Sequence, residues 1–254
     1  MSISDLTEDK RNIHLLLEYD GTDFAGWQIQ AQGRTVQGEL ARALEILLKE
    51  PIRPTGSGRT DAGTHALGQV AHFHTASQLP TDRILRALNG LLPADIAVRA
   101  AEEAPADFHA RYSAKSKRYQ YRIHCGKSGL NRRYVWTFYQ ELDVEAMRRA
   151  TLTLPGQHSF AAFCKQNPMP DHFDCQIADC TLERNGAELI FEIEANRFLR
   201  HMVRIIVGTL TEIGTGRRDP EEMADLLVSG RRDQAGVTAP ARGLCLLRVF
   251  YPDL

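Results

Sequence analysis

The same order of predicted secondary-structure elements occurs twice along the chain, and this repeat limits the possible folds more than any other feature of the sequence. Apolar residues alternate over short runs that predict strands, and they recur at helical spacing in longer amphipathic segments. In the first half these patterns predict strands at 12–19, 52–55, 68–75 and 96–101, with helices at 36–49 and 81–91. The resulting order is strand, helix, strand, strand, helix, strand.

The second half repeats this order. The patterns predict strands at 117–124, 177–184, 187–195 and 243–251, helices at 144–154 and 198–213, and one further helix at 220–228. Two copies of a split βαβ unit predict an α+β protein made of two ferredoxin-like halves, each with an antiparallel sheet flanked by helices. We expect an N-terminal half at 1–110 and a C-terminal half at 111–254.

The composition is typical of a globular protein. Of the 254 residues, 43% are hydrophobic and 25% are charged, and the formal net charge is −1. Apolar runs are too short to span a bilayer, and the polar segment at 1–11 lacks the apolar core of a signal peptide. We therefore expect a cytoplasmic protein without a membrane partner. The five cysteines are scattered and form no CxxC pair, so neither a disulfide framework nor a zinc site is expected.

A glycine-rich stretch at 56–65, GSGRTDAGTH, contains no large apolar side chain, so a packed core does not explain it. Its glycines permit backbone angles closed to other residues and allow a second molecule to approach closely. Asp61 lies among them, two residues after Arg59. A carboxylate on such a loop is either a turn former that accepts a hydrogen bond from a nearby backbone N–H, or a reactive group. The local sequence alone favours the turn former.

Cationic and aromatic residues are mixed between Phe108 and Gln140, where no acidic residue occurs. Cationic side chains neutralise phosphates, and aromatic rings stack on unpaired bases. The mixture therefore favours a nucleic-acid partner, although strand alternation predicts that half of the rings face the core. In the strand from Lys117, one face carries Lys117, Tyr119 and Tyr121 and so combines a cation with two rings.

The helix predicted at 198–213 carries a polar stripe. At about 100° per residue, the stripe comprises Arg197, Arg200, His201, Arg204, Gly208 and Thr211. The simplest interpretation is a basic face exposed to solvent. However, Arg204 is flanked by branched apolar residues, and Gly208 leaves the surface one turn later uncovered. A guanidinium close to the apolar core needs an anionic partner, and Asp61 is a partner of that kind.

Three other features are weaker candidates. His72 and His74 face the same way on a strand as a possible metal pair, but no third ligand is evident, and solvent-facing histidines are the simpler interpretation. His158 and Ser159 have no acid beside them, so a helix start explains them better than a nucleophile does. The proline-bearing loop at 165–170 is either a connector or a contact, and we expect RNA contacts from Lys165 and Gln166.

Together these segments resemble the TruA family of tRNA pseudouridine synthases. The resemblance is carried by EYDG at 18–21, GWQ at 26–28, GRTDAGTHALGQV at 58–70, DFHARYSA at 107–114, KRYQYRI at 117–123, NRFLRHMVRIIVG at 196–208 and TAPARGLCLLRVFYP at 238–252. It covers nearly the whole chain, and the combination of GRTDAG with HMVR is highly specific. One departure is Thr64, which stands where the family pattern has Val.

The resemblance implies an isomerase that converts uridine to pseudouridine at positions 38 to 40 of the tRNA anticodon stem-loop, without cofactor or metal. It also implies a homodimer that binds tRNA across both subunits, with a catalytic cleft between the two halves of the chain. Asp61 is then the catalytic nucleophile, Tyr119 stacks on the uracil and Arg204 pairs with Asp61. The remaining implied roles are RNA contacts from Arg59, which helps to hold the flipped nucleotide, and from Phe108, His109, Ala110, Arg111 and Tyr112, with an apolar pocket wall from Leu244 and Leu246.

The chemistry explains why these residue types are needed. The target base must leave its stack at a cost of a few kcal/mol, and stacking on an aromatic ring returns about 1–3 kcal/mol. Asp61 either attacks C1′ of the sugar directly or accepts a proton in a route through an eliminated sugar. Pairing with Arg204 keeps the Asp61 carboxylate ionised and in position. Tyr119 is also a candidate proton acceptor or donor late in the reaction.

Two other classes of protein stay open at this point. One is a non-catalytic RNA-binding protein of two ferredoxin-like modules. The other is a metal-dependent hydrolase that uses His72, His74 and Asp61.

Overall fold

The computed structural model describes residues 10–165 and 169–252, and the chain forms two compact units. Unit 1 contains the described residues up to Lys115 together with those from Arg248 onward, and unit 2 is Ser116–Leu247. The last strand, β10 (Leu244–Phe250), is therefore divided between the units. The order of elements along the sequence did not anticipate that the C-terminal residues belong with the first half.

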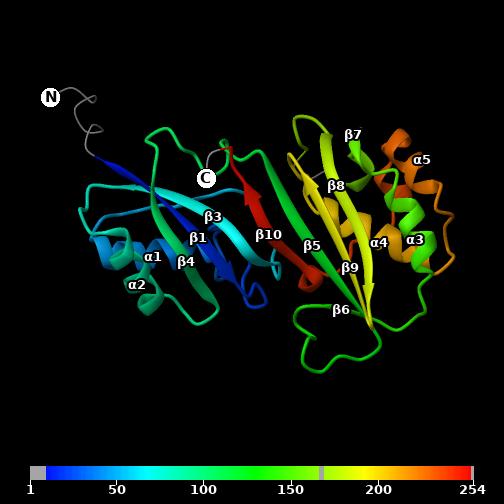
Figure 1. Cartoon of the computed structure of the whole chain (residues 1–254), viewed down its shortest axis with the longest axis horizontal. Helices are drawn as coiled ribbons and strands as arrows, with labels where there is room; N and C mark the ends of the chain where they lie inside the picture. Colours follow the sequence, from blue (N-terminus) through cyan, green and yellow to red (C-terminus); the bar gives the residue numbers. More distant parts are fainter. Residues whose placement is uncertain (1–9, 166–168, 253–254) are drawn as a thin grey trace. The chain divides into compact units, whose positions relative to one another are not determined.

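Unit 1 has the order β1, α1, β2, β3, α2, β4 (Figure 1). The bounds are β1 Arg11–Tyr19, α1 Val36–Leu48, β2 Thr55–Gly56, β3 His65–Thr75, α2 Thr81–Leu91 and β4 Ile96–Ala104. The strands pair in the antiparallel order β4-β1-β3-β2, which confirms the predicted ferredoxin-like arrangement. The strand predicted at 52–55 is reduced to the two residues of β2.

Local signals account for the first helix. The side chain of Thr35 accepts a hydrogen bond from the N–H of Gly38 and so caps the start of α1. The helix then buries one face, through Val36, Leu40 and Leu44 among others. It ends at Leu48, after which Lys49 adopts a left-handed conformation with φ 56°.

Unit 2 repeats the arrangement with additions. The bounds are β5 Ser116–Cys125, β6 Trp136–Phe138, α3 Val144–Thr151, β7 Gly156–Ser159, η2 Ala161–Phe163, β8 Asp174–Asn185, β9 Glu188–Ala195, α4 Met202–Gly214, α5 Glu222–Ser229, η3 Arg232–Gln234 and η4 Ala241–Gly243. The strand order is β10-β5-β9-β8-β7, and β6 joins β5 in parallel. The β10-β5-β9-β8 portion is the second ferredoxin-like sheet, so the predicted α+β fold class is confirmed in both halves.

Two local predictions for unit 2 are wrong. The helix expected from residue 198 begins only at Met202, because His201 has a left-handed backbone with φ 63° and separates Arg197 and Arg200 from the helix. His158 and Ser159 do not start a helix; they form the end of β7, which pairs with β8. None of the helices in the part of the chain described is long and apolar enough to cross a membrane.

Candidate active site

Asp61 lies on the loop between β2 and β3, and hydrogen bonds fix its neighbours. The hydroxyls of Thr60 and Tyr19 are 2.8 Å apart, and the Thr60 carbonyl accepts from the N–H of Trp27 at 3.1 Å. On the other side, the N–H of Thr64 donates to the carbonyl of Asp61 at 3.1 Å and closes a turn. The half-buried Asp61 is therefore held through the backbone on both sides, while the preceding Arg59 is exposed.

The fully buried side chain of Gln69 ties the start of this loop to the sheet. Its Oε1 accepts from the hydroxyl of Ser57 at 2.7 Å, and its Nε2 donates to the carbonyl of Gly58 at 3.0 Å. The same Nε2 lies 3.5 Å from the hydroxyl of Tyr19, which links Gln69 to the pair that fixes Thr60. The loop is thus fixed by neutral groups in a connected network.

Glycines explain why the EYDG and GWQ segments accompany the Asp61 loop. A Cβ on Gly21 would lie 1.9 Å from the carbonyl oxygen of Thr64. A Cβ on Gly26, which has φ +103°, would lie 2.6 Å from the carbonyl oxygen of Thr60. The backbone of one loop therefore packs directly on the backbone of the other. At Thr64 the hydroxyl is buried without a hydrogen-bond partner among the described residues, an environment that suits the Val of the family pattern.

The segment 108–112 divides into anchors and exposed side chains. Phe108 and Ala110 are buried. The carbonyl of Phe108 accepts from Asn12 Nδ2 at 2.8 Å, and Ala110 donates its N–H to His72 Nδ1 at 3.1 Å. Arg111 and Tyr112 are exposed, and the ring of half-buried His109 lies 4.3 Å from that of Tyr112. The side chains of this segment that reach the surface are therefore those of His109, Arg111 and Tyr112.

His72 is buried beneath this segment, so the expectation of a solvent-facing histidine is wrong for His72 and correct only for His74. Burial, with smaller contributions from His109 and His74, lowers the pKa of His72 to about 4. The neutral ring suits its role as acceptor for Ala110. The described residues contain no group of three or more His, Cys, Asp or Glu placed to hold a metal, so the hydrolase alternative has no ligand set there.

Tyr119 lies on β5 in unit 2, opposite Ile193 of β9. Its ring is largely buried and meets the ring of Phe198 edge-on at a centroid distance of 4.9 Å. Leu244 and Leu246, at the start of β10, are also buried. All three side chains are thus largely withdrawn from solvent.

Arg204 is half-buried on α4 and is held by the segment that precedes β10. Its Nε donates to the carbonyl of Ala239 at 2.7 Å, and the N–H of Ala239 donates to the carbonyl of Arg204 at 3.0 Å. The next carbonyl, of Pro240, accepts from the Tyr121 hydroxyl at 2.7 Å. The surface at Gly208 is not uncovered as predicted, since a Cβ there would lie 1.7 Å from the carbonyl oxygen of Val237.

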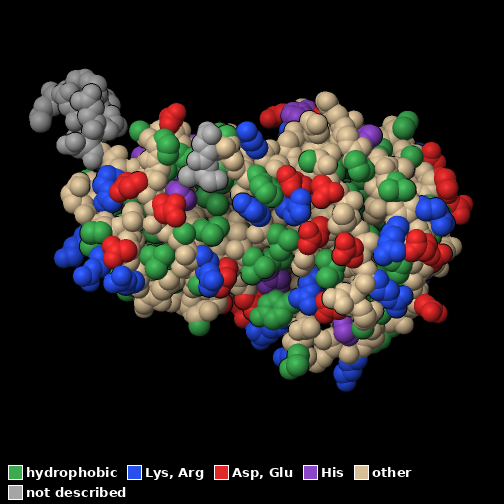
Figure 2. Space-filling view, viewed as in Figure 1, with side chains coloured by type: hydrophobic (Ala, Val, Ile, Leu, Met, Phe, Trp, Pro, Cys, Tyr) green, Lys and Arg blue, Asp and Glu red, His purple; other side chains and the backbone are tan. Residues whose placement is uncertain are grey.

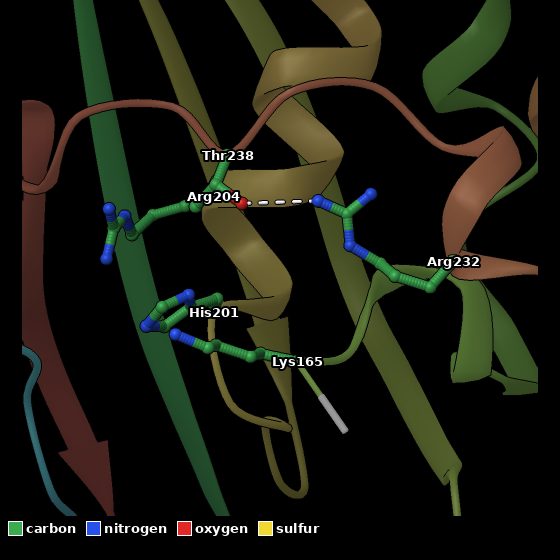
Figure 3. Close-up of a pocket in the computed structure, with 5 residues that line it drawn as sticks. All are labelled: Lys165, His201, Arg204, Arg232 and Thr238. Atoms are coloured by element: carbon green, nitrogen blue, oxygen red, sulfur yellow. Dashed lines mark hydrogen bonds between the residues drawn. The ribbon is translucent and has the colours of Figure 1, made fainter. Parts of the chain in front are cut away.

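A pocket of about 440 Å³ opens beside Arg204 within unit 2 (Figure 3). It is lined by Lys165, His201, Arg204, Arg232 and Thr238. The sequence patterns indicated Lys165, His201 and Arg204 as candidates. They gave no sign of Arg232, because no local pattern links this residue to α4. Thr238 lies in a segment of the family resemblance but was given no role. Gln166, predicted as an RNA contact, is outside the described residues.

These features define a class of α+β protein in which one unit fixes a half-buried carboxylate on a glycine-rich loop and the other gathers cations around a pocket. The family model described as tRNA pseudouridine synthase matches residues 16–113 and 150–252. The chain therefore belongs to the tRNA pseudouridine synthase family, as the resemblance predicted.

Individual relatives agree with this assignment. The chain is 49% identical over 243 residues to the tRNA pseudouridine synthase A of Moorella thermoacetica, a match that covers 94% of this chain and 99% of the relative. It is 51% identical over 237 residues to the protein of the same name from Halalkalibacterium halodurans, covering 92% and 90% of the two chains. A solved Cbf5-Nop10-Gar1 complex matches with 11% identity and a TM-score of 0.35, covering 98% of this chain and 61% of that one, and adds nothing to the assignment.

Proposed function

We propose that this chain isomerises uridine to pseudouridine in tRNA, with Asp61 as the nucleophile. Membership of the family supports the reaction. The observation that carries the role of Asp61 is its position: a half-buried carboxylate on a loop whose neighbours are fixed by buried hydrogen bonds. A carboxylate held in one place favours attack, because the geometry of approach strongly affects the rate.

In the proposed reaction a carboxylate oxygen of Asp61 attacks C1′, and the C1′–N1 bond breaks with its electron pair on the uracil. The uracil turns, C5 attacks C1′ and the carboxylate leaves as a free anion. The C5 proton is then lost and N1 takes up a proton, so the product is an isomer of the substrate. Tyr119 stacks on the flipped uracil, and Arg204 pairs with the Asp61 carboxylate.

The narrower assignments follow the family resemblance. We propose that the substrate uridines are at positions 38 to 40 of the anticodon stem-loop, that Arg59, His109, Arg111 and Tyr112 contact RNA, and that Leu244 and Leu246 form the pocket wall. We also propose that the enzyme acts in the cytoplasm as a homodimer. Pseudouridine mapping in tRNA from cells that lack this protein tests the positions, and static light scattering tests the dimer.

Tritium release tests the reaction and the role of Asp61 together. Formation of the C1′–C5 bond expels the hydrogen at C5, so tRNA labelled there with tritium should release it to water. We expect Asp61→Asn to abolish release while it retains tRNA affinity within about threefold, because the variant lacks the nucleophile but keeps its shape. Asp82→Asn is the matched control, since Asp82 is an exposed acid of the same unit that pairs with Arg86.

Two results would contradict the proposal. If the wild-type protein releases no tritium from any tRNA, the enzyme assignment fails, and the result favours a non-catalytic RNA-binding protein. If Asp61→Asn is as active as Asp82→Asn, the nucleophile is another residue.

A further inference from the structure

The pocket around Lys165, His201, Arg204, Arg232 and Thr238 has a strongly basic lining. Among the residues that the structure describes, its lining comprises two arginines, a lysine, a histidine and a threonine, without a carboxylate. On the face shown in Figure 2, by contrast, Lys and Arg are interspersed with Asp and Glu, and the net charge of the chain is −1. The positive charge in this pocket is therefore a local feature.

Arg232 is held by neutral acceptors. One terminal nitrogen donates to the carbonyls of Ala235 and Gly236 at 3.3 and 3.1 Å, and the other donates to the hydroxyl of Thr238 at 3.2 Å (Figure 3). Burial lowers the pKa of Arg232, and the nearby Glu212 acts in the opposite direction. The carboxylate of Glu212, however, accepts from Arg218 Nε at 2.6 Å and from the N–H of Val237 at 3.0 Å.

An anion in the pocket would therefore meet a partly desolvated guanidinium that donates hydrogen bonds to the uncharged acceptors of Ala235, Gly236 and Thr238. Such a cation gains more from an anion than one in open solvent does, because the effective dielectric constant is lower.

His201 and Lys165 are fixed beside each other through the backbone. Lys165 donates its N–H to the carbonyl of Arg200 at 3.0 Å, directly before His201. His201 has φ 63°, a left-handed conformation that costs a residue with a side chain about 1 kcal/mol. Its side chain does not cap α4. The chain thus keeps an imidazole at a position where glycine would be less strained.

We propose that this pocket binds a phosphate group of the RNA backbone, with Lys165 and His201 as donors. Arg232 adds positive charge and holds the segment 235–239 in place. The inference rests on the proposed function for the choice of RNA as the ligand. A volume of about 440 Å³ has room for a phosphate with its sugar, since small-ligand pockets commonly measure ~300–1,000 Å³. Phosphate contacts fix the position of an RNA without reading its sequence.

The test measures tRNA affinity at several salt concentrations, with the full-length protein carrying Asp61→Asn so that no turnover occurs. We expect Lys165→Gln to weaken binding about tenfold and to lower the slope of log K against log salt by about one, the effect of one lost phosphate contact. We expect His201→Gly to weaken binding about fivefold while thermal stability stays equal or rises, because glycine tolerates this backbone conformation. A loss of binding in that variant is then not a loss of folding.

Arg231→Gln is the matched control. Arg231 precedes Arg232, carries the same charge as Lys165 and forms an exposed ion pair with Asp233 at 2.7 Å. We expect tRNA affinity within about twofold of the parent for this variant. If Lys165→Gln and His201→Gly bind tRNA as Arg231→Gln does at every salt concentration, the proposal is overturned.

Calorimetry with inorganic phosphate distinguishes a pocket that binds RNA phosphate from one that binds a free anion. Weaker binding of both phosphate and tRNA by the pocket variants supports the proposal. Weaker binding of phosphate with unchanged tRNA affinity overturns it, since the pocket would then serve a free anion. The proposed function fails separately, through the absence of tritium release by the wild-type protein.

Discussion

The Asp61 loop of unit 1 and the Arg204 pocket of unit 2 are both polar, but different interactions hold them. Neutral buried side chains, including Tyr19, Thr60 and Gln69, fix the loop that carries the acid. In the pocket, Arg204 and Arg232 donate to backbone carbonyls and keep their positive charge together. The neutral network fixes the position of Asp61, whereas the arginines of the pocket create a positive electrostatic potential. Substitutions in the first region should change turnover, and substitutions in the second should change salt-dependent RNA binding.

The largest expected effect is a loss of stability at a glycine. In each region, taken by itself, a glycine lets two backbone segments of that region pack directly against each other. A Cβ would lie 1.9 Å from the Thr64 carbonyl oxygen at Gly21 and 1.7 Å from the Val237 carbonyl oxygen at Gly208. Backbone must move in either case, so we expect Gly21→Ala and Gly208→Ala each to lower the free energy of unfolding by about 3 kcal/mol or more. Urea denaturation of the full chain measures the change.

Gly90→Ala is the control for these two variants. A Cβ on Gly90 meets nothing within 4 Å, and the residue lies in α2, so alanine should raise the free energy of unfolding by about 0.5–1 kcal/mol. A loss below about 1 kcal/mol for Gly208→Ala would show that the segment 235–239 is not fixed against α4.

A change at Gln69 separates the two regions. Gln69→Leu leaves the Ser57 hydroxyl and the Gly58 carbonyl without this partner, and we expect a loss of about 2–3 kcal/mol of stability. Because the loop then holds Asp61 less firmly, kcat should fall about tenfold, while the salt slope of tRNA binding stays unchanged. The exposed Gln78, changed to Leu, is the control. If Gln69→Leu changed the salt slope of tRNA binding and left kcat unchanged, the two regions would not have the separate roles described above.

The last expected effect, which is absent at neutral pH, is an acid sensitivity at His72. This histidine has a pKa near 4 when folded and near 6.5 in the unfolded chain. The unfolded state therefore takes up a proton first as the pH falls. The stability contributed by the neutral ring is full above about pH 6.5, falls by about 3 kcal/mol as the pH drops through 4, and levels off below that.

Urea titrations of the wild type and His72→Gln at a series of pH values measure this dependence. We expect the wild type to lose stability more steeply than the variant between pH 6.5 and 4, with faster amide exchange at Ala110. Parallel profiles for the two proteins would show that the buried ring titrates normally.

Short-range signals in the sequence predicted the elements well, and long-range contacts account for what it missed. The bounds of α1 follow from Thr35 and the apolar spacing, which are local. The late start of α4 depends on the backbone of His201, which a periodic pattern does not reveal. Gly208 was interpreted as an open surface because Val237, its neighbour in space, is far along the chain. Arg232 was missed for the same reason, since its role depends on where the segment 235–239 lies.

The division of β10 has a consequence for synthesis. Lys115 donates its N–H to the carbonyl of Phe250 at 2.8 Å, and the hydroxyl of Tyr251 donates to the carbonyl of Ala110 at 2.6 Å. Both contacts lie within unit 1, yet unit 2 is encoded between their partners. A ribosome must therefore complete the whole of unit 2 before the unit that carries Asp61 receives its last residues. Domains usually fold in the order in which they emerge, but here the unit begun first is the unit finished last.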